Sequence, residues 1–187
     1  MLASVPKNIL LFLLGLFLGI AALVLVGGVV WAIRRMRKIK GKGAKKYILF
    51  NFASVLVVAA SWVLNFGWLR FFLTILLIPI LHGLIYFVFN FYAFAYLEQS
   101  SKMKRYNMLF ILTYLLTYLL LPDGGDVGEM YFFFGLIHNQ ILSGITYALS
   151  RVAFIAHIVF FVLQIVERIK IKKRKAVIPG AEDEAGI

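Results

Sequence analysis

The sequence predicts an all-α integral membrane protein, a helix bundle with about five transmembrane helices. Three observations predict this class: hydrophobic residues make up 63% of the 187 residues, only 15% are charged, and the mean hydropathy is +0.92. Soluble domains are only about 45–50% apolar, so this chain cannot build a water-facing surface of ordinary polarity. A soluble enzyme and a soluble DNA-binding domain are therefore excluded.

The first predicted span is the apolar run over residues 9–33, because the hydrocarbon core requires about 20 apolar residues per helix. A cleaved signal peptide is the alternative, since Lys7 precedes the run. The run is too long for a signal peptide, and a basic cluster follows it. We therefore expect an uncleaved span. Its Gly15 and Gly19 form a GxxxG pair, which favours close packing within the protomer, with a second copy or with a membrane partner.

Four further spans are expected along the chain. Their predicted ranges are 47–64, 71–97, 106–121 and 141–166. Pro122 ends the fourth because proline cannot continue a helix, and the glycine-rich stretch 123–129 is expected to be a loop. Residues 130–138 are expected to form an interfacial or re-entrant segment. The spans make one membrane domain over residues 1–175, followed by a flexible polar tail over 176–187.

The distribution of basic residues predicts the orientation. The formal net charge is +12, and most Lys and Arg fall in three clusters, after the first, third and fifth spans. The positive-inside rule places all three clusters in the cytoplasm. That placement requires an odd number of spans, with the N-terminus outside and the C-terminus in the cytoplasm. The expected location is the cell's inner or plasma membrane. Basic runs beside apolar segments also indicate contacts with anionic lipid headgroups, rather than with nucleic acid.

Three of the predicted spans carry a polar stripe. Residues 82, 86 and 90 lie four apart on one helix face, and residues 143, 150, 157 and 164 recur every seven residues. Polar side chains have no reason to face lipid, so the stripes are expected to face one another. They predict either hydrogen bonds between helices or a polar pocket for a ligand or ion. The candidate binding residues are Asn51, Ser61, His82, Tyr86, Asn90, Ser150, His157 and Gln164.

Arg151 is a further candidate binding residue, and the most informative one. It lies about ten residues into the fifth span, roughly 15 Å along the helix, where an arginine costs from about 2.5 kcal/mol upward unless it pairs or snorkels. Its predicted partners are carboxylates of the 123–129 loop, a bound anion or a lipid phosphate. Arg70 lies at a span boundary, and we expect its side chain to snorkel to the interface.

Two weaker hypotheses concern metals and cofactors. Carboxylates at intervals of three suit a hard cation or an acid–base pair, although a solvated turn is the alternative; the residues are Asp123, Asp126 and Glu129, with His138. His82 and His157 could ligate a haem or pigment, although their estimated depths differ by about 7–8 Å. They could instead be core histidines or a proton relay. Because the chain has no cysteine, disulfides and thiolate metal sites are excluded.

Three functional hypotheses follow. The first is a small non-enzymatic membrane protein, a structural, assembly or accessory subunit that packs through the Gly15–Gly19 face. The second is a binding or transport protein whose polar pocket takes a small anionic or lipid ligand, with Arg151 receiving the anionic group. The third is a lipid-modifying intramembrane enzyme that uses the acidic loop and His138. No HExxH, GxSxG or P-loop pattern is present, which favours the first hypothesis.

Overall fold

The computed structural model describes residues 42–65, 67–124 and 130–177 and, before them, only Gly27, Val30 and Arg34. The chain divides into two compact units, Met1–Gly41 and Lys42–Ile187. Several predictions fall outside the described residues. They are the span over 9–33 with Gly15 and Gly19, the carboxylates Asp126 and Glu129, and the last ten residues of the tail.

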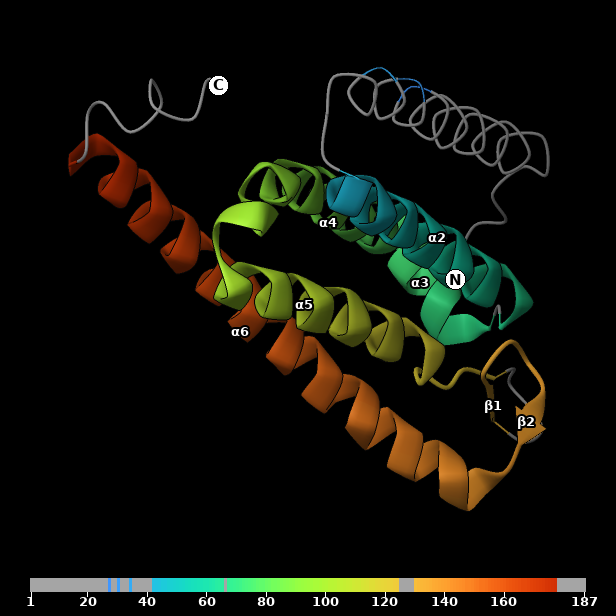
Figure 1. The fold of residues 1–187 in the computed structure, drawn as a ribbon. Coiled ribbons are helices and arrows are strands. Elements are labelled where there is room, and N and C mark those ends of the chain that lie inside the picture. Colours follow the sequence, from blue (N-terminus) through green and yellow to red (C-terminus); the bar gives the residue numbers. More distant parts are fainter. Residues whose placement is uncertain are drawn as a thin grey trace. The chain divides into compact units, whose positions relative to one another are not determined.

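The second unit is a helix bundle with one short hairpin (Figure 1). Helix α6 packs along α5, and α2 packs against both α5 and α4. Aromatic side chains from α2, α4 and α5 form much of the core. The elements are α2 (Lys42–Leu64), α3 (Trp68–Ile75), α4 (Ile78–Ala93), the 3₁₀-helix η1 (Phe94–Gln99), α5 (Ser101–Leu119), β1 (Tyr131–Phe132), β2 (Ile137–His138) and α6 (Gln140–Val177).

Three helices of the described residues are long and apolar enough to cross a membrane. They are Lys46–Leu64, Ile78–Gln99 and Gln140–Arg174. This finding supports the all-α membrane class. The fourth predicted span, 106–121, falls on α5, which is not one of these three helices. The count of five spans and the orientation stay predictions.

The third predicted span, 71–97, is not one continuous helix, although Ile78–Gln99 is one of the three candidate spans. The range is divided at Leu77, which precedes α4 and whose φ of 57° is left-handed. Pro79 follows in the first turn of α4, a position where proline's missing N–H leaves no helical bond unmade. Hydropathy stays high across the break, so an apolar window does not detect it.

Residues 131–138 form an antiparallel hairpin, in the segment predicted as interfacial or re-entrant. Tyr131 pairs with His138 and also bridges Asp123. Gly135 turns the hairpin with a φ of +73°, and a Cβ there would lie 2.9 Å from the Leu64 carbonyl oxygen. Glycine is therefore required, because the turn is both left-handed and in contact with the end of α2.

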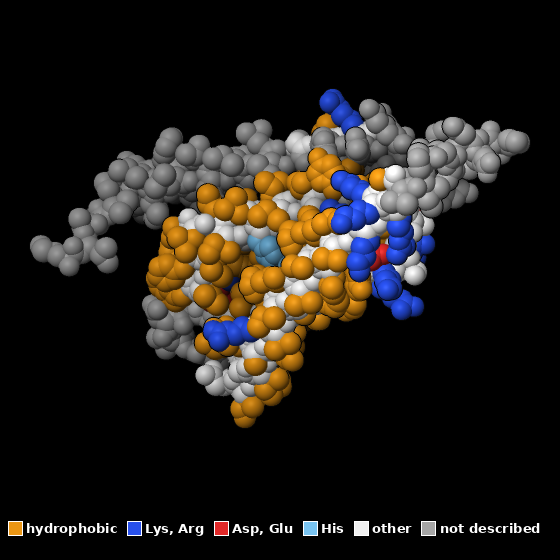
Figure 2. All heavy atoms as spheres, turned by 90° about the vertical axis from the view of Figure 1, so that its left-hand side faces the viewer, with side chains coloured by type: hydrophobic (Ala, Val, Ile, Leu, Met, Phe, Trp, Pro, Cys, Tyr) orange, Lys and Arg blue, Asp and Glu red, His pale blue; other side chains and the backbone are white. Residues whose placement is uncertain are grey.

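Basic side chains gather at one end of the bundle, which we call the basic end. On the face in Figure 2, hydrophobic side chains predominate and Lys and Arg cluster at that end. The exposed basic residues come from the start of α2, the start of α5 and the end of α6. They are Lys46, Lys102, Lys104, Arg105, Lys170, Lys172, Lys173 and Arg174.

Candidate functional site

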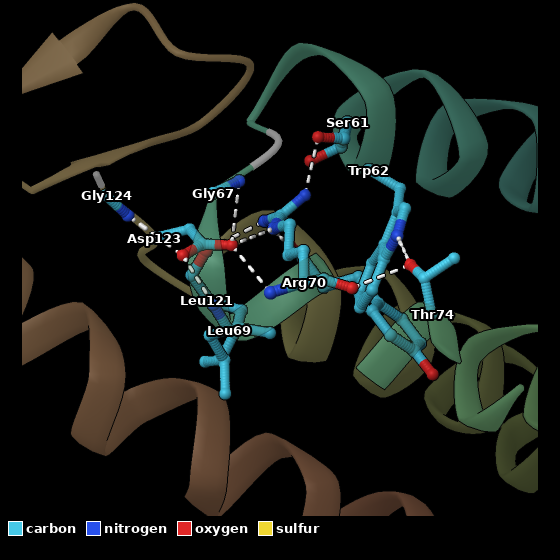
Figure 3. A network of polar contacts seen from close by, with 10 residues as sticks. Ser61, Trp62, Gly67, Leu69, Arg70, Thr74, Leu121, Asp123 and Gly124 are labelled. Carbon is cyan, nitrogen blue, oxygen red and sulfur yellow. Dashed lines mark hydrogen bonds and ion pairs between the residues drawn. The ribbon is translucent and has the colours of Figure 1, made fainter. Parts of the chain in front are cut away.

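Arg70 is buried, contrary to the prediction that it snorkels. Its exposed fraction is 0%, and its guanidinium donates to the backbone oxygens of Ser61 at 2.5 Å and Leu121 at 2.8 Å (Figure 3). A third bond runs to the Tyr118 oxygen at 3.1 Å. Arg70 of α3 thus joins the ends of α2 and α5, and backbone carbonyls replace the water that a snorkelling side chain would seek.

The Asp123 carboxylate completes this network. It accepts backbone N–H bonds from Gly67, Leu69 and Arg70 at the start of α3, at 2.8–3.1 Å, and one from Gly124 at 2.9 Å. A carboxylate is favourable at this position, since a helix N-terminus leaves its N–H groups unbonded. Its Oδ2 also lies 3.9 Å from the Nε of Arg70. Both carboxylate oxygens therefore accept N–H groups at the α3 terminus, and Oδ2 is also paired with Arg70.

Trp62 and Thr74 enclose the other side of Arg70. The guanidinium carbon lies 5.0 Å from the Trp62 ring centroid, a favourable cation–π distance. The Trp62 indole donates to the Thr74 hydroxyl at 2.9 Å, which in turn donates to the Arg70 backbone oxygen at 2.6 Å. Burial lowers the pKa of Arg70 to about 10, and the Asp123 charge opposes that shift. The guanidinium is therefore charged at neutral pH.

Arg151 is exposed on α6 and makes no ion pair with Asp123, one of its predicted carboxylate partners, whereas Asp126 and Glu129 lie outside the described residues. Its guanidinium lies 4.2 Å from the Tyr147 ring centroid and donates to the Tyr147 hydroxyl. Within the described residues, the only ion pair is Arg70–Asp123. In this part of the chain, Arg151 consequently has a stacking partner but no carboxylate to neutralise its charge.

Arg151 lines a groove of about 460 Å³. Helix α6 supplies Tyr147, Ser150, Arg151, Phe154 and Ile155 to it. The facing walls are mainly apolar, apart from Thr117 and Tyr118, and come from α2, α3, the start of α4 and the end of α5; they are Trp62, Leu69, Leu73, Ile78, Pro79, Thr117, Tyr118 and Leu121. The groove therefore combines one unpaired cation with a long apolar surface.

Behind the Tyr118 wall, two histidines contact each other. The His82 and His157 ring centroids are 5.1 Å apart at an interplanar angle of 81°. His82 Nδ1 bonds the Tyr118 hydroxyl at 2.6 Å, and His157 Nδ1 donates to the Phe110 carbonyl oxygen at 3.1 Å. The rings touch, so a macrocycle would fit between them only if the helices moved apart. Ligation of a haem or pigment stays a prediction.

Four of the other predicted binding residues make side-chain hydrogen bonds between helices: Asn51, Tyr86, Asn90 and Ser150. Asn90 donates to Asn51 Oδ1 at 3.2 Å, and Ser150 donates to the Thr117 carbonyl oxygen at 2.7 Å. Tyr86, which stacks on Tyr114 at 3.7 Å, bonds to Ser54 at 2.7 Å. Ser61 and Gln164 are also buried. Of the nine candidate binding residues, only Ser150 and Arg151 line the groove.

The predicted metal ligands are not brought together among the described residues. His138 is exposed on β2, with its Nε2 3.0 Å from the Gly135 oxygen. No group of three His, Asp or Glu side chains suited to a metal occurs in the part of the chain that the structure describes. Asp126 and Glu129 lie outside it.

The sequence analysis missed the aromatic face of α5. Phe110, Tyr114 and Tyr118 lie four residues apart, all are buried, and each contacts the His82 or His157 ring. Their spacing matches that of the His82 stripe, so the same i, i+4 search over aromatic residues would have found them.

Comparison of the chain with family models, curated proteins and solved structures found no match. Its function is therefore inferred from its own residues.

Proposed function

We propose that this protein binds an anionic amphiphile in the Arg151 groove, the second of the three functional hypotheses. The main support is that Arg151 has no carboxylate partner among the described residues and lies at the edge of an apolar groove of about 460 Å³. Ligand pockets commonly have volumes of about 300–1,000 Å³ and join apolar walls to a few polar groups. This groove has both properties.

The position of Arg151 supports an anionic ligand. It lies about eleven residues after the start of α6, or roughly 16 Å along the helix, inside the candidate span Gln140–Arg174. A charge at such depth is costly unless it is neutralised. A carboxylate or phosphate suits the planar guanidinium because both accept two parallel hydrogen bonds. An acyl chain would lie along Phe154, Ile155 and Leu73.

Two sources can supply this chemistry, a bilayer phospholipid or a free fatty acid. Native mass spectrometry of the full chain in neutral detergent separates them, with phosphatidylglycerol, phosphatidylcholine and oleate as probes. We expect the anionic probes to be retained over phosphatidylcholine, and Arg151→Met to weaken that retention about 10- to 100-fold, as for the loss of a charged hydrogen bond of about 1.5–3 kcal/mol. Retention of phosphatidylglycerol alone identifies a phospholipid, and of oleate alone a fatty acid.

Arg105→Met is the matched control, because Arg105 is an exposed arginine at the basic end. As one of eight exposed basic residues at that end, it should contribute little to retention, so its loss should weaken binding of the anionic probes far less than Arg151→Met does. Equal retention of phosphatidylcholine, or unchanged binding by Arg151→Met, contradicts the proposal.

The other two hypotheses stay predictions. The structural-subunit hypothesis depends on Gly15 and Gly19, and the enzyme hypothesis on Asp126 and Glu129, all outside the described residues. Asp123, the remaining carboxylate of the predicted catalytic set, is engaged with the α3 terminus.

A further inference from the structure

The face of α6 that is buried against the bundle is polar along most of its length. The stripe residues at positions 143, 150, 157 and 164 are all buried, as are Thr146 and Glu167. From Ser150 to Glu167 the helix rises roughly 25 Å, most of a hydrocarbon core of about 30 Å. Leucine and alanine would pack these helices without burying polar atoms, so packing alone does not account for this α5–α6 seam.

At the groove end of the seam, three groups that accept and donate protons are in contact. Tyr118 lines the groove and its hydroxyl bonds His82 Nδ1 at 2.6 Å. The His82 ring contacts the His157 ring. Because His157 Nδ1 donates to a carbonyl oxygen, the Nε2 of its neutral ring keeps the lone pair that accepts a proton.

A carboxyl group lies at the other end of the seam. Glu167 is 6% exposed, and the Ser100 hydroxyl, just before α5, donates to its Oε1 at 2.7 Å. Glu167 is placed near the basic end, with the exposed Lys170 one turn further along α6. Arg168, the neighbouring charge, is turned to the Phe89 carbonyl oxygen at 2.9 Å.

Fully buried carboxamides lie between these two ends. Asn107 and Gln164 are 0% exposed, and none of their side-chain oxygens or nitrogens has a partner among the described residues. On the α5 side, Asn107 falls between Ser100 and Phe110. Ser100 bonds Glu167, and Phe110 stacks on His157. On α6, Gln164 falls between His157 and Glu167. In the antiparallel register set by the Phe110–His157 and Ser100–Glu167 contacts, the two carboxamides are offset by about one helical turn, or roughly 6 Å.

Unpaired buried amides call for a ligand that forms hydrogen bonds. Each unsatisfied group costs about 1–3 kcal/mol, and Asn90 Oδ1 is a further unsatisfied atom on α4. Buried water typically satisfies such groups with about three bonds each. Water between the two carboxamides would also connect His157 with Glu167, which are about ten residues, or roughly 15 Å, apart along α6.

We propose that the bundle conducts protons along the α5–α6 seam, and that Asn90, Asn107 and Gln164 hold the water that connects its two ends. The route runs from Tyr118 and His82 through His157 and this water to Glu167. At each step one O–H or N–H bond forms as the next one breaks, so one proton leaves for each proton that enters. No other bond changes, and the route does not depend on a ligand in the groove.

Proton flux into proteoliposomes tests this proposal. The full chain is reconstituted with pyranine inside, and a potassium gradient with valinomycin sets the membrane potential. We expect flux above that of protein-free liposomes, and at least a tenfold loss in Gln164→Leu and in Glu167→Gln. The matched control is Gln99→Leu, because Gln99 is an exposed carboxamide that bonds only its own helix turn; its flux should equal that of the wild type.

Two results overturn the proposal: wild-type flux no faster than protein-free liposomes, or undiminished flux through Gln164→Leu. Asn107→Leu carries the same prediction as Gln164→Leu, so a single misfolded variant does not decide the outcome. Binding of anionic probes is measured without a proton gradient, and failure of either proposal is therefore recognised separately.

Discussion

Arg70 and Arg151 have opposite environments. Arg70 is fully buried, with three carbonyl acceptors and a carboxylate beside it. Arg151 is exposed on a groove, and among the described residues its one bonded partner is Tyr147. The same charged group is thus part of the framework at one position and open to a ligand at the other.

Helix termini explain the difference. The last carbonyls of a helix lack a full set of partners within it. Arg70 donates to the Ser61 oxygen in the last turn of α2, which also accepts the Asn65 N–H, and to the Leu121 oxygen just after α5. Asp123 binds the unbonded N–H groups that open α3. Arg151 lies in the middle of α6, where the carbonyls are already bonded within the helix. The backbone carbonyls within reach of each guanidinium, and not its position along a predicted span, therefore determine which arginine has hydrogen-bond acceptors.

The largest expected effect comes from removing Arg70. Arg70→Met leaves the Asp123 carboxylate and three carbonyls without their cation, and breaking such a buried pair costs about 3–5 kcal/mol. Arg151→Met should change the free energy of unfolding by less than about 0.5 kcal/mol, as for other exposed positions. Unfolding in mixed detergent–SDS micelles, followed by circular dichroism, measures both. Equal destabilisation by the two variants would remove the distinction between the two arginines.

A methyl group at Gly67 should produce the next largest effect. A Cβ there would lie 2.6 Å from both Asp123 Oδ1 and the Gly124 oxygen, so the capped start of α3 must shift. We expect Gly67→Ala to lower the free energy of unfolding by about 1–3 kcal/mol, as for an overpacked core. The matched control is Gly144→Ala, because a Cβ on Gly144 meets nothing within 4 Å. A wild-type unfolding curve for Gly67→Ala would show that the cap is not tightly packed.

The sequence predicted the membrane class well because hydropathy is summed over long segments. The helices α2 and α6 cover the predicted ranges 47–64 and 141–166, since twenty apolar residues specify a span regardless of detail. The sequence did not reveal the break within the predicted range 71–97, because a single left-handed residue, Leu77, divides the helix without changing its hydropathy.

The roles of the charged residues were harder to predict for a physical reason. Asp123 and Arg70 are 53 residues apart and meet through helix termini, a tertiary contact that no local spacing encodes. The seven-residue stripe on α6 was easier, because periodicity indicates which face is buried. It did not indicate that Tyr118 and Thr117 would line the groove opposite Arg151.

Tyr118→Phe tests whether the Tyr118 hydroxyl in the groove wall contributes to binding of the anionic ligand or only to stability. The variant removes the hydroxyl that bonds His82, and the loss of one such bond costs about 1 kcal/mol of stability. The Tyr118 carbonyl that binds Arg70 is unchanged. We therefore expect a small decrease in the free energy of unfolding and wild-type retention of phosphatidylglycerol or oleate. A large loss of that retention would mean that the hydroxyl binds the ligand directly.

The smallest expected effect comes from Arg151→Lys, and it distinguishes charge from shape. Lysine keeps the positive charge but lacks the planar fork that binds a carboxylate or phosphate through two bonds. It also stacks less well on Tyr147, the ring that holds the guanidinium at 4.2 Å. We expect about threefold weaker binding of the retained anionic probe in native mass spectrometry, which corresponds to about 0.65 kcal/mol, with unchanged stability. Because Arg151→Met removes both charge and fork, its loss should be clearly greater. If Arg151→Lys bound as poorly as Arg151→Met, two-bond geometry rather than charge would determine which anion the groove accepts.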